Sequence, residues 1–226
     1  MTSPTDPIHT SHTKPTAQLP VFIMPGFHSS ALTEQLLASL PSFVSATVIE
    51  ASPVSPFEIY QWLQTNITLS SNSKQATSKQ ATLPIVAIGF SAGVVGLAGA
   101  LLMWQQMGGE VAQFIAVDGW GVPIVGLPVT RMSHDRFTHL STLPLGSGKM
   151  NFFAVPSVPH QQLWERPQTV EGIAISSSAN AFWPHQEETG IPMSAATFIR
   201  RSLHKEWDKV FSWRAASSGP DIGTST

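Results

Sequence analysis

The chain has 226 residues, of which 42% are hydrophobic and 12% are charged, and its formal net charge is -2. This length and hydrophobic content suit one domain with a sizeable core. The 12 Lys and Arg residues form no basic run, which argues against nucleic-acid binding, and the lack of cysteine excludes disulfides, thiolate metal ligands and a cysteine nucleophile.

The N-terminal segment, residues 1–19, is rich in Thr, Ser, Pro and His and has no apolar core of the kind that a signal peptide needs. We expect it to be a disordered tail. The longest apolar run, residues 94–104, contains Gly96 and Gly99 and is well short of the roughly 20 residues that a membrane span needs. We therefore expect a cytoplasmic protein without integral membrane association.

Short β-branched runs alternate with helical stretches, a pattern typical of βαβ units and a parallel sheet. The sequence predicts six strands, at residues 21–24, 46–50, 85–90, 113–117, 128–132 and 151–155. It predicts helices at residues 31–39, 57–67, 94–107 and 195–211, the last of them capped by Ser194. The expected fold is a single α/β domain over residues 20–213, with a mostly parallel sheet flanked by helices.

A polar segment before the third strand repeats the pentapeptide Ser-Lys-Gln-Ala-Thr at residues 73–77 and 78–82. This repeat is too short to build an architecture, so residues 70–82 are interpreted as a low-complexity surface loop without chemistry. The small and polar residues 214–226 predict a flexible C-terminal tail.

The third strand carries the most functional information, because it ends in Gly89-Phe90-Ser91-Ala92-Gly93. This Gly-x-Ser-x-Gly pattern joins an apolar strand to a helix and thus predicts a serine on a sharp turn. Such a turn holds the hydroxyl clear of the backbone, where a base can reach it, and the helix start offers N–H groups to a developing oxyanion. The structural alternative is an ordinary strand-to-helix turn with small residues for close packing.

On these residues the chain resembles the α/β-hydrolase superfamily, and in particular a small serine hydrolase without a lid, over most of residues 21–170. The resemblance implies that Ser91 is the nucleophile of a Ser-His-Asp triad that needs no cofactor. It places the two oxyanion donors at the backbone N–H groups of Phe27, in the turn at residues 24–29, and of Ala92. Proline stands at position 25, where the family more commonly has histidine.

The family order of nucleophile, acid and then histidine implies that the base comes late in the chain. His160 follows the last predicted strand and fits this place better than the other histidines. Asp135 follows the fifth strand and precedes His160 by a separation typical of the family, so it is the favoured acid. Asp118 directly follows the fourth strand and is the alternative acid, because some family members place the acid one strand earlier.

Two neighbouring patterns admit other roles. His134, Asp135 and His139 are metal-ligand types close together in the sequence, but they indicate no fourth ligand, and we expect no metal. Trp120 lies in the short segment 119–127, where many relatives insert a helical cap. It is a candidate substrate-binding residue, although core packing explains it equally well.

These residues predict hydrolysis of a small-molecule ester or thioester through an acyl-enzyme intermediate. The main alternative is a non-catalytic binding protein that retains the fold, because fold does not fix function. Another reaction on the same triad, such as carbon–carbon bond hydrolysis or acyl transfer to an alcohol, is the third hypothesis. The physiological substrate and the oligomeric state stay open at this point.

Overall fold

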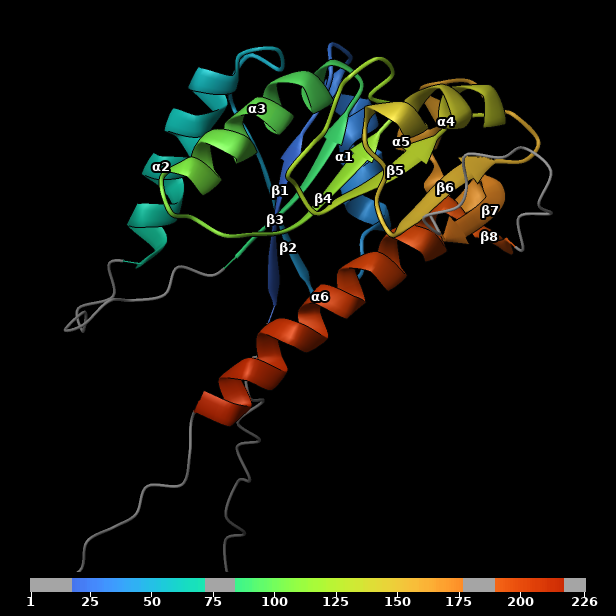
Figure 1. Ribbon diagram of the computed structural model, residues 1–226. Coiled ribbons are helices and arrows are strands. Elements are labelled where there is room, and N and C mark those ends of the chain that lie inside the picture. Colours follow the sequence, from blue (N-terminus) through green and yellow to red (C-terminus); the bar gives the residue numbers. More distant parts are fainter. Residues whose placement is uncertain (1–17, 72–83, 177–189, 218–226) are drawn as a thin grey trace, which may run out of the picture.

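The computed structural model describes residues 18–71, 84–176 and 190–217 and is built around one eight-stranded sheet (Figure 1). The strand order is β2-β1-β3-β4-β5-β6-β7-β8. The strands are β1 (Leu19–Met24), β2 (Val44–Val48), β3 (Ile85–Phe90), β4 (Val111–Val117), β5 (Val129–Ser133), β6 (Met150–Ala154), β7 (Glu171–Ser176) and β8 (Ile191–Ser194). Strands β1 to β6 pair in parallel, whereas β7 and β8 pair antiparallel. The predicted α/β class and mostly parallel sheet are confirmed, but the predicted number of six strands is wrong.

Helices cover both faces of the sheet, with α2 and α3 together on one face and α6 across the other (Figure 1). The helices are α1 (Ser30–Ser39), α2 (Pro56–Ser71), α3 (Ala92–Gln106), α4 (Arg136–Thr142), α5 (Gln162–Glu165) and α6 (Ala195–Ser217). Two short 3-10 helices, η1 (Leu143–Leu145) and η2 (Pro167–Thr169), follow α4 and α5. The four predicted helices correspond to α1, α2, α3 and α6.

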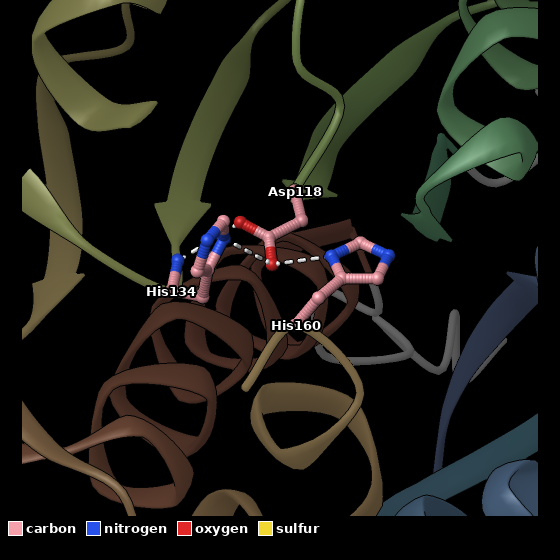
Figure 2. A group of neighbouring side chains, drawn as sticks. All are labelled: Asp118, His134 and His160. Atoms are coloured by element: carbon pink, nitrogen blue, oxygen red, sulfur yellow. Dashed lines mark hydrogen bonds and ion pairs between the residues drawn. The ribbon is translucent and has the colours of Figure 1, made fainter. Parts of the chain in front are cut away.

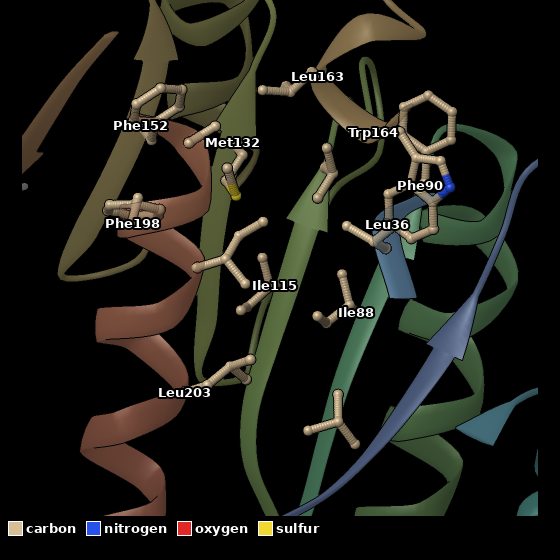
Figure 3. Packing of buried hydrophobic residues seen from close by; sticks show 14 of the residues in the cluster. Leu36, Ile88, Phe90, Ile115, Met132, Phe152, Leu163, Trp164, Phe198 and Leu203 are labelled. Atoms are coloured by element: carbon tan, nitrogen blue, oxygen red, sulfur yellow. The ribbon is translucent and has the colours of Figure 1, made fainter. Parts of the chain in front are cut away.

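Alternate residues of the central strands enter two separate cores. Ile88 and Phe90 of β3 pack with Trp164 of α5 and with α1 and α6 (Figure 3). Ala87 of the same strand instead packs with α2 and α3. Every residue of β3 is therefore buried, which is why its sequence is a continuous apolar run rather than an alternating one.

The two strands that the sequence analysis missed lie at one edge of the sheet. In β8, Ile191 and Pro192 are exposed, so its apolar pattern is weak. Proline is tolerated in an edge strand because one side of the strand needs no N–H donor for a neighbouring strand. The antiparallel pair β7 and β8 extends the sheet beyond the predicted last strand.

The predicted ends of the domain shift slightly. Strand β1 begins at Leu19, which is buried, and α6 continues to Ser217. Ser194 caps α6 as predicted, because its Oγ accepts a hydrogen bond from the Thr197 N–H at 3.3 Å.

The two predicted tails and the predicted loop lie mostly outside the described residues, at 1–17, 72–83 and 218–226. Within the described ranges, no helix combines the length and the apolar character needed to cross a membrane.

The sheet topology places one crevice at the carboxyl ends of the parallel strands. Strand β1 lies between β2 and β3. The connection that leaves the end of β1 runs to β2 on one side, whereas the connection that leaves the end of β3 runs to β4 on the other side. Ligands of open α/β sheets bind at such a switch point. The neighbouring strands β4 and β5 are joined by residues 118–128 without a helix, which leaves this side of the crevice open.

Candidate active site

Ser91 lies on a strained turn at the carboxyl end of β3. Its backbone has φ 52° and ψ -119°, a conformation that costs a non-glycine residue about 1–3 kcal/mol. The Ser91 N–H donates to the Val117 carbonyl of β4 at 2.9 Å, and the Ser91 side chain makes no capping hydrogen bond to α3. The turn therefore presents the hydroxyl instead of using it to cap the helix.

The loop after β1 packs directly against this turn. A Cβ on Gly93 would lie 2.3 Å from the Met24 carbonyl oxygen, and a Cβ on Gly26 would lie 3.1 Å from the Ser91 Cβ. Real Cβ atoms do not approach backbone oxygen that closely, so glycine at position 93 permits the contact. The structure thus brings together the two turns that the sequence analysis singled out.

The two predicted oxyanion donors lie on either side of this contact. Ala92 is the first residue of α3, and the first N–H groups of a helix have no intrahelical acceptor. Phe27 follows Gly26 and is 73% exposed, and within the described part of the chain its N–H has no hydrogen-bond acceptor. Both N–H groups are therefore free to bind an anionic oxygen near Ser91.

His160 is paired with a buried carboxylate, and that carboxylate belongs to Asp118 (Figure 2). His160 Nδ1 lies 2.9 Å from Asp118 Oδ2. Asp118 directly follows β4, where its φ of 50° turns the chain, and its side chain is 1% exposed. The structure therefore brings the predicted base to the alternative acid of the sequence analysis.

Asp135, the acid that the sequence analysis favoured, has a different set of contacts. Its Oδ1 accepts a hydrogen bond from the Thr138 N–H at 2.6 Å, which caps α4, and its Oδ2 lies 3.1 Å from His134 Nε2. The expected contact between Asp135 and His160 is wrong. The physical reason is α4, a helix that the sequence analysis did not predict and that takes this carboxylate as its N-cap.

His134, at the carboxyl end of β5, contacts both oxygens of Asp118. Its backbone N–H donates to Oδ1 at 2.9 Å, and its Nδ1 lies 3.0 Å from Oδ2 (Figure 2). Burial raises the pKa of Asp118, but the hydrogen bonds from His134 and His160 and the charge of His134 outweigh burial and hold the pKa below the ordinary 3.8. Asp118 is therefore an ionised acceptor at neutral pH.

An aromatic stack orients the His160 ring. Phe90, the residue before Ser91, stacks on His160 with a centroid distance of 4.6 Å and an interplanar angle of 22°. Phe90 also stacks on Trp164 at 4.9 Å, and Trp164 Nε1 donates to Thr33 Oγ1 at 3.3 Å in the core. Rings packed this way cannot turn freely, so the stack and Asp118 together fix the imidazole. The position of Phe90 within the serine motif was the available signal for this role.

A pocket of about 430 Å³ opens above these residues. It is lined by Ser91, Ala92, Val95, Asp118, Trp120, Val122, His134, Phe137, Thr138 and His160. Of the predicted site residues, Asp135 and Phe27 do not line it. Trp120 does, and it is 68% exposed, so core packing does not explain this tryptophan. Val95, His134 and Phe137 were not predicted, because no motif marks them.

Of the three metal-ligand types that are close together in the sequence, His134 and Asp135 are in contact at 3.1 Å, whereas the His139 ring has other neighbours. His139 is buried and stacks on Phe153 at 5.1 Å. Burial, with the charges of Arg136 and Arg131, lowers the pKa of His139 to about 4, so its ring is neutral. Among the described residues, the group that could hold a metal ion is Asp118, His134 and His160, whose ligand atoms lie within 4.8 Å of one another. Their N–O distances of 2.9 and 3.0 Å are those of hydrogen bonds, in which a proton fills the space between the atoms.

The chain matches no family model and none of the curated proteins with which it was compared.

A buried guanidinium holds the wall of the pocket. Arg131 of β5 is 2% exposed and donates to the carbonyl oxygens of Val122 at 2.8 Å, Leu145 at 3.1 Å and Gly146. Burial lowers its pKa to about 10, so the group stays charged at neutral pH. Arg131 thus ties the loop that carries Trp120 to the turn at η1.

Replacing Arg131 with methionine is expected to lower the free energy of unfolding by about 3 kcal/mol. The three carbonyl oxygens that Arg131 binds would lose their charged hydrogen-bond donor, which is buried. Urea denaturation measures the change. Arg200→Met, at an exposed position on α6, is the matched control and should stay within about 0.5 kcal/mol of the parent. Equal stability of the two variants would show that Arg131 does not support the wall.

Proposed function

We propose that the protein is a serine hydrolase of the α/β-hydrolase type that cleaves a carboxylic ester or thioester. Ser91 is the nucleophile, His160 the base and Asp118 the acid. The observation that carries the proposal is a strained, half-buried serine in the same pocket as a histidine whose Nδ1 is bound by a buried carboxylate. The resemblance of the sequence to this superfamily points in the same direction.

The contacts of His160 define the direction of proton transfer. Its Nδ1–H donates to Asp118, which leaves Nε2 unprotonated and able to accept the Ser91 proton. Ser91 Oγ then forms a bond to the carbonyl carbon, and the N–H groups of Phe27 and Ala92 stabilise the resulting oxyanion. Such donors contribute about 3 kcal/mol each in comparable sites.

The second half of the reaction returns the enzyme to its resting state. The carbon–oxygen or carbon–sulfur bond breaks as His160 gives its proton to the leaving alcohol or thiol, and an acyl-Ser91 ester remains. Water then enters, gives a proton to His160 and attacks the acyl carbon. Collapse of this second oxyanion releases the carboxylic acid and returns the proton to Ser91. Asp118 stays ionised throughout and stabilises the transient imidazolium.

The mouth of the pocket favours an apolar substrate group. Val95, Trp120 and Phe137 line it from α3, from the β4–β5 loop and from α4, and they are 43%, 68% and 74% exposed. The titratable residues of the lining are Asp118, His134 and His160, which the catalytic network already uses. Exposed apolar groups gathered at one cavity mark a binding surface. We therefore assign the site an ester or thioester with a neutral, hydrophobic acyl or alcohol part.

Trp120→Ser is expected to lower kcat/KM for p-nitrophenyl octanoate about 10-fold, because about 50 Å² of apolar contact at roughly 25 cal/mol per Å² is lost. The acetate ester should change less than about 2-fold, since it does not reach the indole. Met107→Ser provides a matched control, because Met107 is 73% exposed and is not among the residues that line the pocket. Equal losses on both esters would contradict substrate contact by Trp120.

A fluorophosphonate probe tests the proposal directly, because it reacts with activated serines and leaves unactivated hydroxyl groups unmodified. The full chain is treated with the probe, and the adduct is located by peptide mass spectrometry. We expect labelling of Ser91 that disappears in His160→Ala. A folded protein that stays unlabelled would overturn the proposal.

One observation keeps the non-catalytic binding protein as the second candidate. Ser91 and His160 line the same pocket, but no hydrogen bond joins them in the described structure. Catalytic hydrogen bonds are often long before substrate binds, so this geometry does not argue against catalysis. Binding of a hydrophobic ester that is never hydrolysed would favour the second candidate.

A further inference from the structure

The His134 ring lies between two carboxylates. Its Nδ1 is 3.0 Å from Asp118 Oδ2, and its Nε2 is 3.1 Å from Asp135 Oδ2. An ionised carboxylate accepts hydrogen bonds and repels the lone pair of an unprotonated nitrogen, so the hydrogen bond to Asp118 and the close ion pair with Asp135 both favour a proton on the facing nitrogen. An imidazole with N–H on both nitrogens is the cation.

We propose that His134 is held as an imidazolium between Asp118 and Asp135 and that it positions Asp118 for His160. The positioning part rests on the proposed serine hydrolase function, whereas the charge state of His134 does not. The resulting chain runs from Asp135 through His134 and Asp118 to His160. The two contacts of Asp118 are hydrogen bonds, at 3.0 Å to His134 and 2.9 Å to His160, and the contact of His134 with Asp135 is an ion pair at 3.1 Å. Asp135 then acts on His160 only through His134 and Asp118.

The contacts of Asp118 explain why a positioning group is needed. Oδ2 is shared by His134 Nδ1 and His160 Nδ1, while Oδ1 accepts the His134 backbone N–H. With both oxygens held by His134, the carboxylate cannot rotate, and its second Oδ2 lone pair stays directed at His160. The two rings meet edge to face, with a centroid distance of 5.9 Å and an interplanar angle of 81°.

The charged and titratable groups around His134 come from three elements. Asp118 faces it from the end of β4, Asp135 from the start of α4 and His160 from the loop after β6. The hydrogen bond to Asp118 raises the pKa of His134 above 6.5, against an opposing effect of burial, and the charges of both carboxylates add to the increase. Asp118 and Asp135 together carry two negative charges, and the His134 imidazolium carries one positive charge. The remaining negative charge can balance the positive charge of His160 when His160 carries the proton.

Nitrogen NMR of the full chain with labelled histidine tests the charge state without any substrate. The His134 signals are identified by their loss in His134→Asn. At pH 7.5 we expect both ring nitrogens to be protonated, whereas an unperturbed histidine with a pKa of about 6.5 is mostly neutral there. A neutral His134 ring at this pH would overturn the proposal. Because the measurement needs no turnover, its outcome is independent of the proposed function.

Kinetics test the positioning role. His134→Ala should lower kcat about 100-fold, since small misplacement of a catalytic group has effects of this size. KM should stay within about 2-fold of the parent, because the apolar residues at the mouth of the pocket are unchanged. Asparagine places an amide N–H near the former Nδ1, so His134→Asn should recover most of the loss. His204→Ala, at an exposed histidine of α6, is the control and should not change kcat.

Equal kcat values for the parent and His134→Ala would overturn the positioning role, as would a His134→Asn variant that is folded but recovers nothing. Thermal unfolding of each variant checks the fold. A parent protein that the fluorophosphonate probe does not label would instead reject the proposed function, and the NMR result would still decide the charge state of His134.

Discussion

Ser91→Ala is expected to abolish ester hydrolysis, with kcat lowered about 10⁵- to 10⁶-fold, because the remaining groups bind substrate but offer no nucleophile. Alanine keeps the Cβ that packs near Gly26 and can occupy the same strained backbone conformation. The thermal midpoint should therefore stay close to that of the parent. Initial rates with p-nitrophenyl esters over a concentration series measure the loss.

The control for this variant is Ser212→Ala, at an exposed position on α6 far along the chain from the site. It should hydrolyse the same esters at the parental rate. Undiminished turnover by purified, folded Ser91→Ala would show that Ser91 is not the nucleophile.

Asp118→Asn is expected to lower kcat about 10⁴-fold, the size of effect seen when the acid of a serine triad becomes an amide. The amide can donate a hydrogen bond to His160 Nδ1, which moves the imidazole proton to Nε2. A protonated Nε2 cannot accept the Ser91 proton. The measurement is kcat at several pH values around neutrality, where the lowered pKa of Asp118 keeps the parental carboxylate ionised.

Asp135→Asn is the matched comparison, since it makes the same chemical change one strand further along. Asparagine is also a good N-cap and can accept the Thr138 N–H hydrogen bond, so α4 should form. We expect kcat to fall less than about 10-fold, because His160 keeps its carboxylate partner. The opposite ranking of the two variants would restore Asp135 as the triad acid.

The strand, turn and helix around Ser91 could be predicted from the sequence, because burial and the close approach of the β1 loop both restrict which residues can stand there. A strand buried on both faces must be apolar throughout, and the turn that follows requires small residues where the β1 loop approaches. The residues that form β3, the turn and α3 are contiguous. Their order therefore predicts their arrangement in space.

The carboxylate that pairs with His160 could not be chosen from the sequence, because Asp118 and Asp135 follow neighbouring parallel strands. The choice depends on which carboxylate faces His160 and which caps a helix. Helix α4 has seven residues, too few for a clear apolar period, so the capping role of Asp135 had no visible signal. In the sequence, His134 was considered only as a metal-ligand type beside Asp135 and His139, because its contacts to Asp118 depend on the register of β4 and β5.

The stack of Phe90 on His160 has a mechanical consequence. Phe90 and Ser91 are joined by one peptide bond, so the ring that stacks on the proposed base, His160, is covalently tied to the proposed nucleophile. A small sliding or tilting of β3 would carry the serine and the imidazole in the same direction and preserve their separation. In the proposed hydrolase, a substrate that displaces the β4–β5 loop on the open side of the crevice would therefore leave the separation of Ser91 and His160 unchanged.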